Sequence, residues 1–357
     1  TRLDSSSASD VYKRQGEELA KRDDIDTVII DEISMVCRTK TDIWRAINAV
    51  INKRGTKKKV WGLTATPIPN EPTDAYHQIK LLCPDRMQGV YFRSFRDRTM
   101  SQVNQFKWVA KPDALDVVDE AMQPAIRYTR DDCIDLPRTI YITRQVELSP
   151  EQKTAYKHML NQLHTELENG EITASNEAVK AGKLVQIACG VVYDNDGVAR
   201  TVPAKSRVDE VIALLEQSQS KTIVFVPYRA PLQMVADALV KAGYEVGVVH
   251  GGVSKNDRDQ VFQSFQTNPG KKHVIVAQPA AMSHGLTLTA ASQIVWYAPV
   301  TSAETYEQAN GRITRPGQKF TPVIVHVEGT DIERRIFSRL RQKQKMQNIL
   351  LDKKAFA

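Results

Sequence analysis

Apolar residues recur along the chain in two patterns, short β-branched runs and longer segments with helical spacing. The run IDTVIIDE (25–32) ends in two acids, as a buried parallel strand does where it leaves a sheet. Residues 41–51 carry apolar side chains at helical intervals, KKVWGLTAT (58–66) reads as a second strand, and a helix over 71–84 stops at Pro84. This alternation predicts an α/β domain with a parallel sheet.

The next stretch, roughly 85–200, is more polar, and its pattern predicts largely irregular structure. Helices are expected at 113–123 and 150–168, with a turn at DNDG (194–197). We therefore interpret residues 111–204 as a helical linker or insertion.

From residue 205 the alternation of strands and helices resumes. The expected helices are 205–217, 230–242, 254–266, one from near 303 and a basic one from 330. The expected strands are 221–226, 245–250, 272–277, 292–298 and 321–328. This pattern predicts a second, complete doubly wound domain, and 357 residues suffice for both domains.

Composition places the chain among soluble globular proteins, with 41% hydrophobic and 25% charged residues. No apolar run approaches the length of a membrane span, so we expect a cytoplasmic protein. The cysteines are far apart and form no CxxC pair, which disfavours a zinc site and suggests thiols in a reducing compartment. They are Cys37, Cys83, Cys133 and Cys189.

The net charge of +7 permits a polyanionic partner without requiring one. Lysine and arginine cluster in NKRGTKKK (52–59) and RRIFSRLRQKQK (334–345). Each cluster has two interpretations, a nucleic-acid contact or a solvated face, and the pattern leaves both open.

The first fifteen residues, TRLDSSSASDVYKRQ, have no periodicity and no apolar core of a signal peptide. The segment SSASDVYKRQ is similar to a translated sequencing adapter. We therefore expect residues 1–15 to be non-native and disordered, with the coding sequence interrupted just before Gly16.

Asp31 and Glu32 form the first candidate site, because ligands of open parallel sheets bind at the carboxyl ends of strands. An aspartate there is suited to a hydrated Mg²⁺, and the neighbouring glutamate to orienting an attacking water. The alternative is a strand end that simply meets solvent. The hydroxyls of Thr64 and Thr66, before Pro67, mark a strand–turn junction that carries little signal by itself.

The stretch QANGRITRPGQ (308–318) is the second candidate. Arg312 and Arg315 lie three residues apart in a segment broken by two glycines and a proline, so they are not part of a regular helical face. Paired arginines fixed in a turn indicate an anion site.

The order of these segments resembles motifs of superfamily-two helicases and translocases. VIIDEIS resembles motif II, GLTATP motif III, and QANGRITRPGQ motif VI. TATPIPNEPTDAYHQIKLLCP, DLPRTIYITRQVELSPEQKTAYKHML (135–160) and VEGTDIERRIF narrow the resemblance to the Swi/Snf type. KTIVFVPYRAPLQMVADAL resembles motif IV, and AMSHGLTLTAASQIVWYAPV motif V. The likeness spans about 25–345.

The resemblance implies two RecA-like parallel-sheet lobes that bind ATP and Mg²⁺ at their cleft. The first, 16–110, would be incomplete and carry motifs II and III; the second, 205–345, would carry motifs IV to VI, followed by a basic tail at 346–357. Asp31 would bind Mg²⁺ through water and Glu32 would activate the hydrolytic water. Thr64 and Thr66 would couple nucleotide and nucleic acid.

The resemblance assigns the arginines to the γ-phosphate, with Arg315 as the finger and Arg312 beside it. Cations held ready for the charge on the transferring phosphoryl group are the physical reason. Gln308, Gly311 and Gly285 are implied at the nucleotide.

For nucleic acid, the resemblance implies largely sequence-independent grip of the phosphate backbone. The implied residues are His250, Gly251, Arg258, Ser283 and Thr287. His250 has an equally good interpretation as a strand-end or core histidine. We expect DNA rather than RNA as the partner, and a monomer.

Two positions depart from the Swi/Snf pattern, with Ser34 in place of the histidine of DE-x-H and Ala65 in place of the glycine of TGTP. HGLTL is closer to annealing-helicase and bacteriophage branches than to chromatin remodellers, and this resemblance implies a bacterial or phage-infected cell. These departures leave ATPase chemistry in place and make remodelling doubtful.

The sequence contains no G-x-x-x-x-G-K-[ST] phosphate loop in a strand–loop–helix setting. We therefore expect the first lobe to lack its opening strands, to expose an apolar edge and to aggregate readily, and this polypeptide to hydrolyse ATP negligibly. Three hypotheses follow: an ATP-dependent DNA translocase or helicase as the parent protein, an inactive nucleic-acid-binding remnant, or an RNA helicase of the same superfamily.

Overall fold

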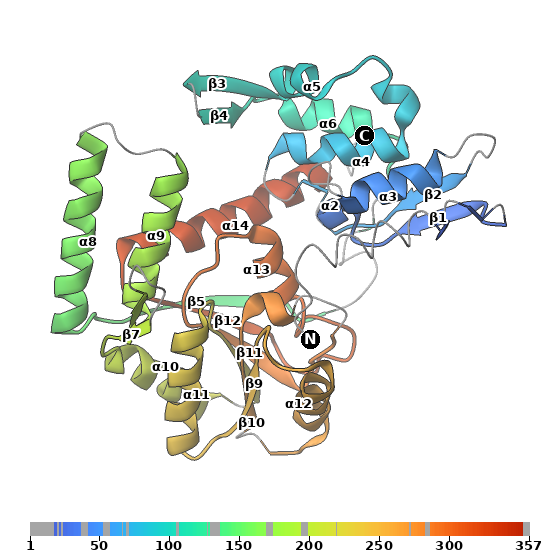
Figure 1. Cartoon of the computed structure of the whole chain (residues 1–357). Helices are drawn as coiled ribbons and strands as arrows, with labels where there is room; N and C mark the ends of the chain where they lie inside the picture. The colour runs from blue at the N-terminus through green and yellow to red at the C-terminus, as the bar shows by residue number, and fades with distance from the viewer. Residues whose placement is uncertain are drawn as a thin grey trace. The chain divides into compact units, whose positions relative to one another are not determined.

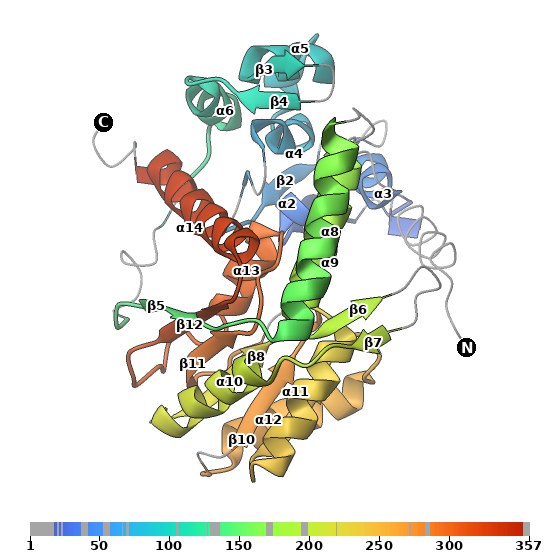
Figure 2. The ribbon, with the colours of Figure 1, turned by 90° about the vertical axis from the view of Figure 1, so that its left-hand side faces the viewer.

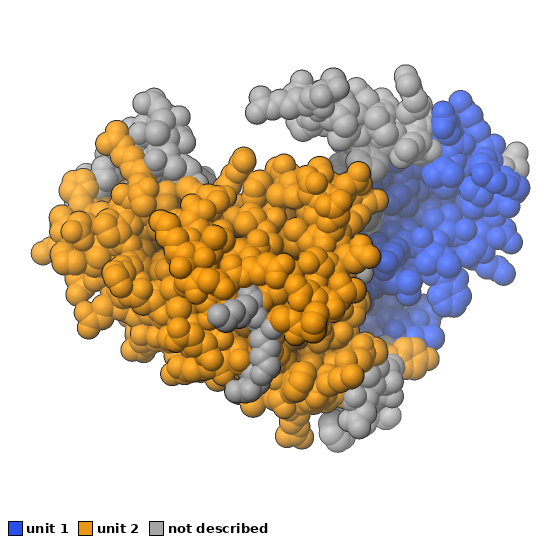
Figure 3. Space-filling view, turned by 90° about the horizontal axis from the view of Figure 1, so that it is seen from below, with its two compact units in different colours: residues 1–127, 345–357 blue, residues 128–344 orange. Residues whose placement is uncertain are grey.

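The computed structural model divides the chain into two compact units, coloured separately in Figure 3. Unit 1 comprises Thr1–Arg127 with Lys345–Ala357, and unit 2 comprises Tyr128–Gln344. The structure describes residues 18–19, 21–22, 24–36, 42–52, 58–65, 67–68, 71–104, 107–126, 128, 136–168, 174–193, 199–218, 220–270, 273–282 and 286–352. The segment 1–15 and the turn at 194–197 lie outside these ranges.

Unit 1 begins with a parallel pair of strands, β1 (Thr27–Ile30) and β2 (Lys59–Gly62). The helices α2 (Ile33–Val36) and α3 (Asp42–Ile51) connect them. Trp44 and Ile51 of α3 pack with Ile30 and Ile33 in a small apolar core, as the helical spacing of 41–51 predicts.

The prediction that residues 25–32 form a buried strand is wrong for one face of the pair. Ile29 is 66% exposed and Trp61 58% exposed, and these two residues are cross-strand partners. Strand side chains alternate between faces, and α3 covers only the face that carries Ile30. Parallel sheets usually have both faces covered. Among the described residues, only one face of this pair is covered.

The rest of unit 1 is more regular than its polar pattern predicts. The 3-10 helix η1 (Pro72–Ala75) leads into α4 (Tyr76–Leu82), where a helix was expected. After η2 (Pro84–Met87) come α5 (Phe92–Thr99), an antiparallel hairpin of β3 (Met100–Asn104) and β4 (Lys107–Ala110), and α6 (Ala114–Met122).

The expectation of irregular structure near residue 92 fails because local contacts replace apolar periodicity there. Ser94 Oγ accepts the N–H of Tyr91 and donates to the Tyr91 carbonyl, which stabilises the start of α5. Arg96 stacks over the ring of Trp108, with 4.0 Å between guanidinium and ring centroid, and so joins α5 to the hairpin.

Unit 2 is built on a six-stranded sheet in the order β5-β12-β11-β8-β10-β9, with every neighbouring pair parallel. The strands are β5 (Ile140–Gln145), β8 (Lys221–Phe225), β9 (Glu245–Val249), β10 (His273–Ala277), β11 (Ala291–Trp296) and β12 (Val323–Glu328). The predicted α/β class with a parallel sheet is confirmed. The edge strand β5 comes from the range that the sequence pattern assigned to the linker.

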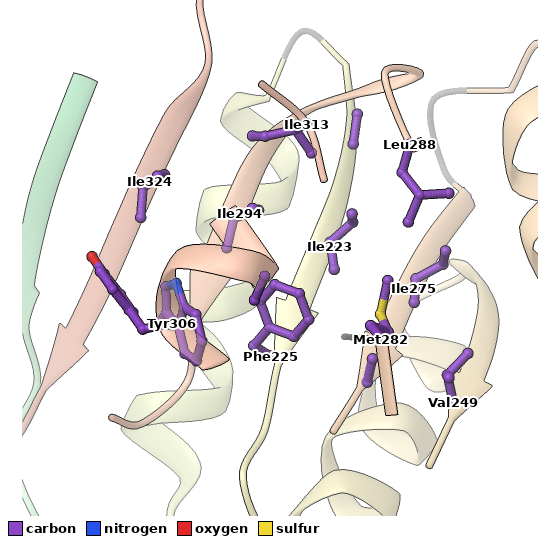
Figure 4. Packing of buried hydrophobic residues seen from close by; sticks show 14 of the residues in the cluster. Ile223, Phe225, Val249, Ile275, Met282, Leu288, Ile294, Tyr306, Ile313 and Ile324 are labelled. Atoms are coloured by element: carbon purple, nitrogen blue, oxygen red, sulfur yellow. The ribbon is translucent and has the colours of Figure 1, made fainter. Parts of the chain in front are cut away.

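Helices cover both faces of this sheet (Figure 1). Side chains of α12 (Lys255–Thr267), α13 (Ala303–Asn310) and α14 (Asp331–Asp352) pack on one face, and those of α10 (Lys205–Gln217) and α11 (Arg229–Lys241) on the other. Figure 4 shows the first of these cores, in which Tyr306 of α13 shares one apolar cluster with Phe225, Ile294 and Ile324 of the strands. The short 3-10 helix η3 (Pro279–Met282) follows β10.

Before this sheet is completed, the chain makes a pair of neighbouring helices, α8 (Pro150–Glu168) and α9 (Ala174–Ala188) (Figure 2). The helix predicted at 150–168 is confirmed, whereas α9 was not predicted. A two-stranded antiparallel sheet, β6 (Val191–Tyr193) with β7 (Ala199–Thr201), follows α9. None of the helices in the described part of the chain is long and apolar enough to cross a membrane.

Candidate functional site

The two acids that follow β1 lie in a tight turn at the carboxyl end of the strand. Asp31 is exposed, and its Oδ1 accepts the N–H of Glu32 at 3.0 Å. Glu32 has a backbone φ of +49°, in the left-handed region that residues other than glycine rarely adopt. Left-handed backbone costs a residue such as glutamate roughly 1 kcal/mol, and strain of this kind gathers at functional sites.

Backbone hydrogen bonds join the ends of β1 and β2 just beyond the acids. The N–H of Leu63 donates to the Ile30 carbonyl at 2.9 Å, and the N–H of Ile33 donates to the Leu63 carbonyl at 3.0 Å. The hydroxyl oxygens of Ser34 and Thr64 lie 2.9 Å apart and share a hydrogen bond. The residue that replaces the expected histidine of motif II thus contacts motif III directly. Thr66 lies outside the described residues.

The acidic turn fits a hydrated Mg²⁺ of the kind that nucleotides carry. Mg²⁺ keeps several waters and is held by one or two carboxylates together with phosphate oxygens, so it needs no complete protein cage. Asp31 and Glu32 supply two carboxylates in this turn, with Asp31 exposed and Glu32 half-buried. Among the described residues, no group of three or more His, Cys, Asp or Glu side chains is placed to hold a metal, so an all-protein metal cage has no candidate there.

In unit 2 the arginine turn follows α13 directly. Ser302 caps the start of α13 by accepting the N–H of Thr305 at 3.2 Å, and the N–H of Gly311 closes its end on the Glu307 carbonyl at 2.8 Å. A side chain at Gly311 would place Cβ 3.3 Å from the Glu307 carbonyl oxygen, which is a tight contact. Gln308 lies in the last turn of this helix and is half-buried.

The two arginines of the turn have different environments. Arg312 is 3% exposed, and its Nη1 donates to the Leu286 carbonyl at 3.2 Å. Arg315 is half-buried, with Nε donating to the Gly311 carbonyl and Nη1 to Thr287 Oγ1, each at 3.3 Å. Long hydrogen bonds to neutral partners leave the Arg315 charge available to an anion, whereas Arg312 is part of the turn's interior.

Two amides that the sequence did not single out fix this turn. Gln318 is 8% exposed, and its Nε2 donates to the carbonyls of Ala291 at 2.8 Å and Ile313 at 2.9 Å. Asn310 is 5% exposed, and its Oδ1 accepts the indole N–H of Trp296 at 2.9 Å. Their side chains tie the turn to both ends of β11. Only the position of Gln318 within the motif could have marked it.

The predicted site residues of unit 2 fall at opposite edges of its sheet. The N–H of Leu288 donates to the Arg312 carbonyl at 3.0 Å, which places the arginine turn at the start of β11. His250 follows the last residue of β9. Because the strands are parallel, their starts and ends lie at different edges. Thr287, predicted with the nucleic-acid group, lies at the arginine turn, where its Oγ1 accepts Arg315 Nη1.

The turn after β9 presents a histidine in a defined orientation. The N–H of Gly252 donates to His250 Nδ1 at 3.0 Å, so the neutral ring carries its proton on Nε2. The N–H of Val253 closes the turn on the His250 carbonyl at 3.0 Å. His250 is half-buried and Gly251 is exposed, which leaves the Nε2–H as a hydrogen-bond donor at the carboxyl edge of the sheet.

Two arginines accompany this histidine turn. Arg258 lies in the first turn of α12 and is half-buried. Its guanidinium is therefore partly accessible, and its contact with nucleic acid stays a prediction. Arg229, the first residue of α11, was not predicted; its Nη2 lies 3.7 Å from the position that a Cβ at Gly252 would take. Ser283 and Gly285 lie outside the described residues.

Two family models match the chain. The model of the SNF2-related domain matches residues 8–189, and the model of the helicase conserved C-terminal domain matches residues 206–317. The first covers just over half of the chain.

Similar proteins come from a phage, a bacterium and an archaeon. "Putative protein p41" of Acyrthosiphon pisum secondary endosymbiont phage 1 is 26% identical over 311 residues, covering 81% of this chain and 64% of the relative. An uncharacterized ATP-dependent helicase of Mycoplasma pneumoniae is 23% identical over 327 residues, covering 89% of this chain and 30% of the relative. The chain thus spans less than two thirds of either relative.

Among solved structures, the SWI2/SNF2 ATPase core of Sulfolobus solfataricus in complex with dsDNA is 20% identical. The alignment covers 93% of this chain and 70% of the Sulfolobus chain, with a TM-score of 0.49.

Proposed function

The chain belongs to the SNF2-related family, and on that premise we propose that its protein is an ATP-driven translocase that moves along duplex DNA. The observation that carries the proposal is the arginine turn of unit 2. Its interior is fixed by buried amides while the Arg315 guanidinium remains half-exposed. A cation held in place before the reaction stabilises a phosphoryl-transfer transition state without reorganising, which is the main catalytic requirement of that chemistry.

ATP with Mg²⁺ supplies the phosphoryl group whose hydrolysis drives movement. In unit 1 the Asp31 carboxylate would hold the hydrated cation, and the Glu32 carboxylate would accept a proton from the attacking water. The Ser34–Thr64 hydrogen bond, 2.9 Å long, ties the acidic turn to the end of β2. In unit 2 Arg315 would neutralise charge on the transferring group, and Arg312, with Gln308 and Gly311, would keep the turn in shape.

The nucleic-acid contact belongs to the opposite edge of the unit 2 sheet. His250, Gly251 and Arg258 would bind backbone phosphates there through side chains and main-chain N–H groups. Such contacts carry no base information, which suits an enzyme that moves along any sequence. Thr287, next to Arg315, would then act at the nucleotide rather than on DNA.

Equilibrium binding to labelled duplexes tests the partner. We expect the chain to bind two unrelated DNA duplexes equally, to prefer them over duplex RNA, and to lose affinity steeply with salt. Preference for the RNA duplex would favour the alternative of an RNA helicase. No salt-dependent binding to any polymer would remove the nucleic-acid part of the proposal.

A second candidate, a nucleic-acid-binding protein without turnover, has one observation in its favour. The printed sequence holds no phosphate-loop motif, so nothing in it would cradle the β- and γ-phosphates. We expect this polypeptide to hydrolyse ATP at background rate with or without DNA. Turnover that rises on adding DNA would contradict that expectation.

A further inference from the structure

The starting observation is the environment of Arg229, which lies at the carboxyl edge of the unit 2 sheet. Arg229 is exposed, and within the described part of the chain it makes no hydrogen bond and no ion pair. It lies beside the His250–Gly252 turn, since its Nη2 is 3.7 Å from the ideal Cβ position of Gly252. An arginine that lies beside a glycine turn and pairs with no carboxylate among the described residues is suited to bind an anion from outside the protein.

The neighbouring histidine, His250, supplies a second hydrogen-bond donor, its Nε2–H group. Since Gly252 N–H occupies His250 Nδ1 at 3.0 Å, the neutral ring presents Nε2–H and no acceptor on its other side. A side chain at Gly252 would press Cβ to 3.1 Å from His250 Cε1 and would also meet Arg229. The missing side chain therefore keeps the arginine and the imidazole close together.

The position in the fold makes both donors accessible to the same ligand. Arg229 begins α11 just beyond β8, and His250 follows β9. The strand β10 pairs with β8 on one side and with β9 on the other. The N–H of Gln278, just after β10, donates to the Val249 carbonyl at 2.9 Å. The carboxyl ends of these strands meet at one edge, where open α/β sheets bind ligands.

We propose that Arg229 and His250 Nε2–H together hold one backbone phosphate of the DNA, with Arg229 as its charge-neutralising ligand. The inference rests on the proposed function, because it names a further residue of the same nucleic-acid edge. The predicted DNA-binding residues are His250, Gly251 and Arg258. The inference adds Arg229 of α11 to them as a ligand of the phosphate. A planar guanidinium binds two phosphate oxygens at once, and the imidazole N–H orients the phosphate.

Salt-dependent DNA binding of the full chain tests this assignment with a control on the same helix. Arg229→Ala removes the first residue of α11, and Lys241→Ala removes an equal charge at its last residue, which is also exposed. The two lie about 18 Å apart along the helix axis at 1.5 Å per residue. Affinity for one DNA duplex is measured by fluorescence anisotropy from about 50 to 200 mM salt.

We expect Arg229→Ala to weaken binding about tenfold at low salt and to reduce the slope of log affinity against log salt by about 1. Lys241→Ala should leave both quantities as in the wild type. His250→Ala should weaken binding at an unchanged slope, because a neutral donor displaces no counterion.

Equal slopes for Arg229→Ala, Lys241→Ala and the wild type would overturn the inference while leaving the proposed function standing. A wild-type chain that binds no duplex would instead remove the proposed function itself. Thermal melting of each variant verifies that the fold is retained. Arg229 and Lys241 are exposed, so their variants should melt as the wild type does.

Discussion

At the scale of single residues, the site depends on backbone and burial that no motif encodes. Arg312 and Arg315 are equivalent letters in the sequence, yet one is 3% exposed and the other half-buried. The residue types at 31 and 32 predicted carboxylate chemistry, whereas the left-handed backbone of Glu32 depends on how the turn is closed by Ile33 and Leu63. Such features arise from tertiary contacts, so local sequence could not predict them.

A buried histidine of β12 that contacts α13 gives a pH-dependent prediction. His326 is fully buried, its Nε2 lies 2.7 Å from the Tyr306 hydroxyl, and its ring stacks on Phe337. Burial, and secondarily the charge of Arg341, lowers the pKa of His326 to about 3. The unfolded chain takes up this proton near pH 6.5, so the stability contributed by neutral His326 is present above that pH and is lost as pH falls towards 3.

We expect the free energy of unfolding to fall by about 1.4 kcal/mol per pH unit more in the wild type than in His326→Gln, over the range below pH 6.5. Glutamine preserves a polar partner for Tyr306 and has no titrating group. Urea unfolding at a series of pH values measures the difference. Parallel curves for the two proteins would show that His326 is protonated in the folded state.

At the scale of elements, long periodic segments were predicted closely and short ones were missed. The helices expected at 150–168 and 205–217 have those bounds in the structure, since many apolar positions at a 3.6-residue period support each assignment. The hairpin of β3 and β4 was missed because each strand is five residues or fewer and much of it is exposed. Its support is the Arg96–Trp108 contact, which is invisible to periodicity.

One buried ion pair joins two elements of unit 2 and yields a stability prediction. Arg207 of α10 and Glu333 of α14 are 1% and 0% exposed, with 2.8 Å between Nη2 and Oε2. Arg207 also donates to the Val327 carbonyl at 3.3 Å, and Glu333 accepts the N–H of Gly329 at 2.9 Å. The pair therefore joins α10 and the end of β12 to the start of α14.

Arg207→Met should lower the free energy of unfolding by about 3–5 kcal/mol, because it leaves the Glu333 carboxylate buried without its cation. The double variant Arg207→Met, Glu333→Gln should recover part of that loss, since no uncompensated charge remains. Urea denaturation of the two variants and the wild type measures both effects. A single variant as stable as the wild type would show that the pair contributes little to folding.

At the scale of the whole molecule, the order of motifs predicted the family and the parallel α/β architecture, and both are confirmed. The order of the motifs is informative because each motif must follow or precede a particular strand. A chance sequence would rarely contain many such motifs in the same order. The roles of individual site residues remain predictions. The contact between Thr287 and Arg315 could not be predicted from the sequence, because only tertiary structure brings the two residues together.

The uncovered face of β1 and β2 gives a prediction about association of whole molecules. Ile29, Trp61 and Leu63 are each more than half exposed, and apolar faces of this kind drive association between chains. Trp61→Ser should reduce concentration-dependent self-association, measured by sedimentation velocity. Val240→Ser, at a residue 58% exposed on α11, is the matched control and should change association little. Equal association of both variants and the wild type would place the contact elsewhere.

The central claim, that the arginine turn stabilises ATP hydrolysis coupled to DNA, is tested most directly by turnover of the polypeptide encoded by the complete gene. The account predicts DNA-stimulated ATP hydrolysis, a loss of about 10³–10⁵ in kcat for Arg315→Ala, and unchanged affinity of that variant for duplex DNA. An Arg315→Ala protein that hydrolyses ATP at the wild-type rate in the presence of DNA would contradict it.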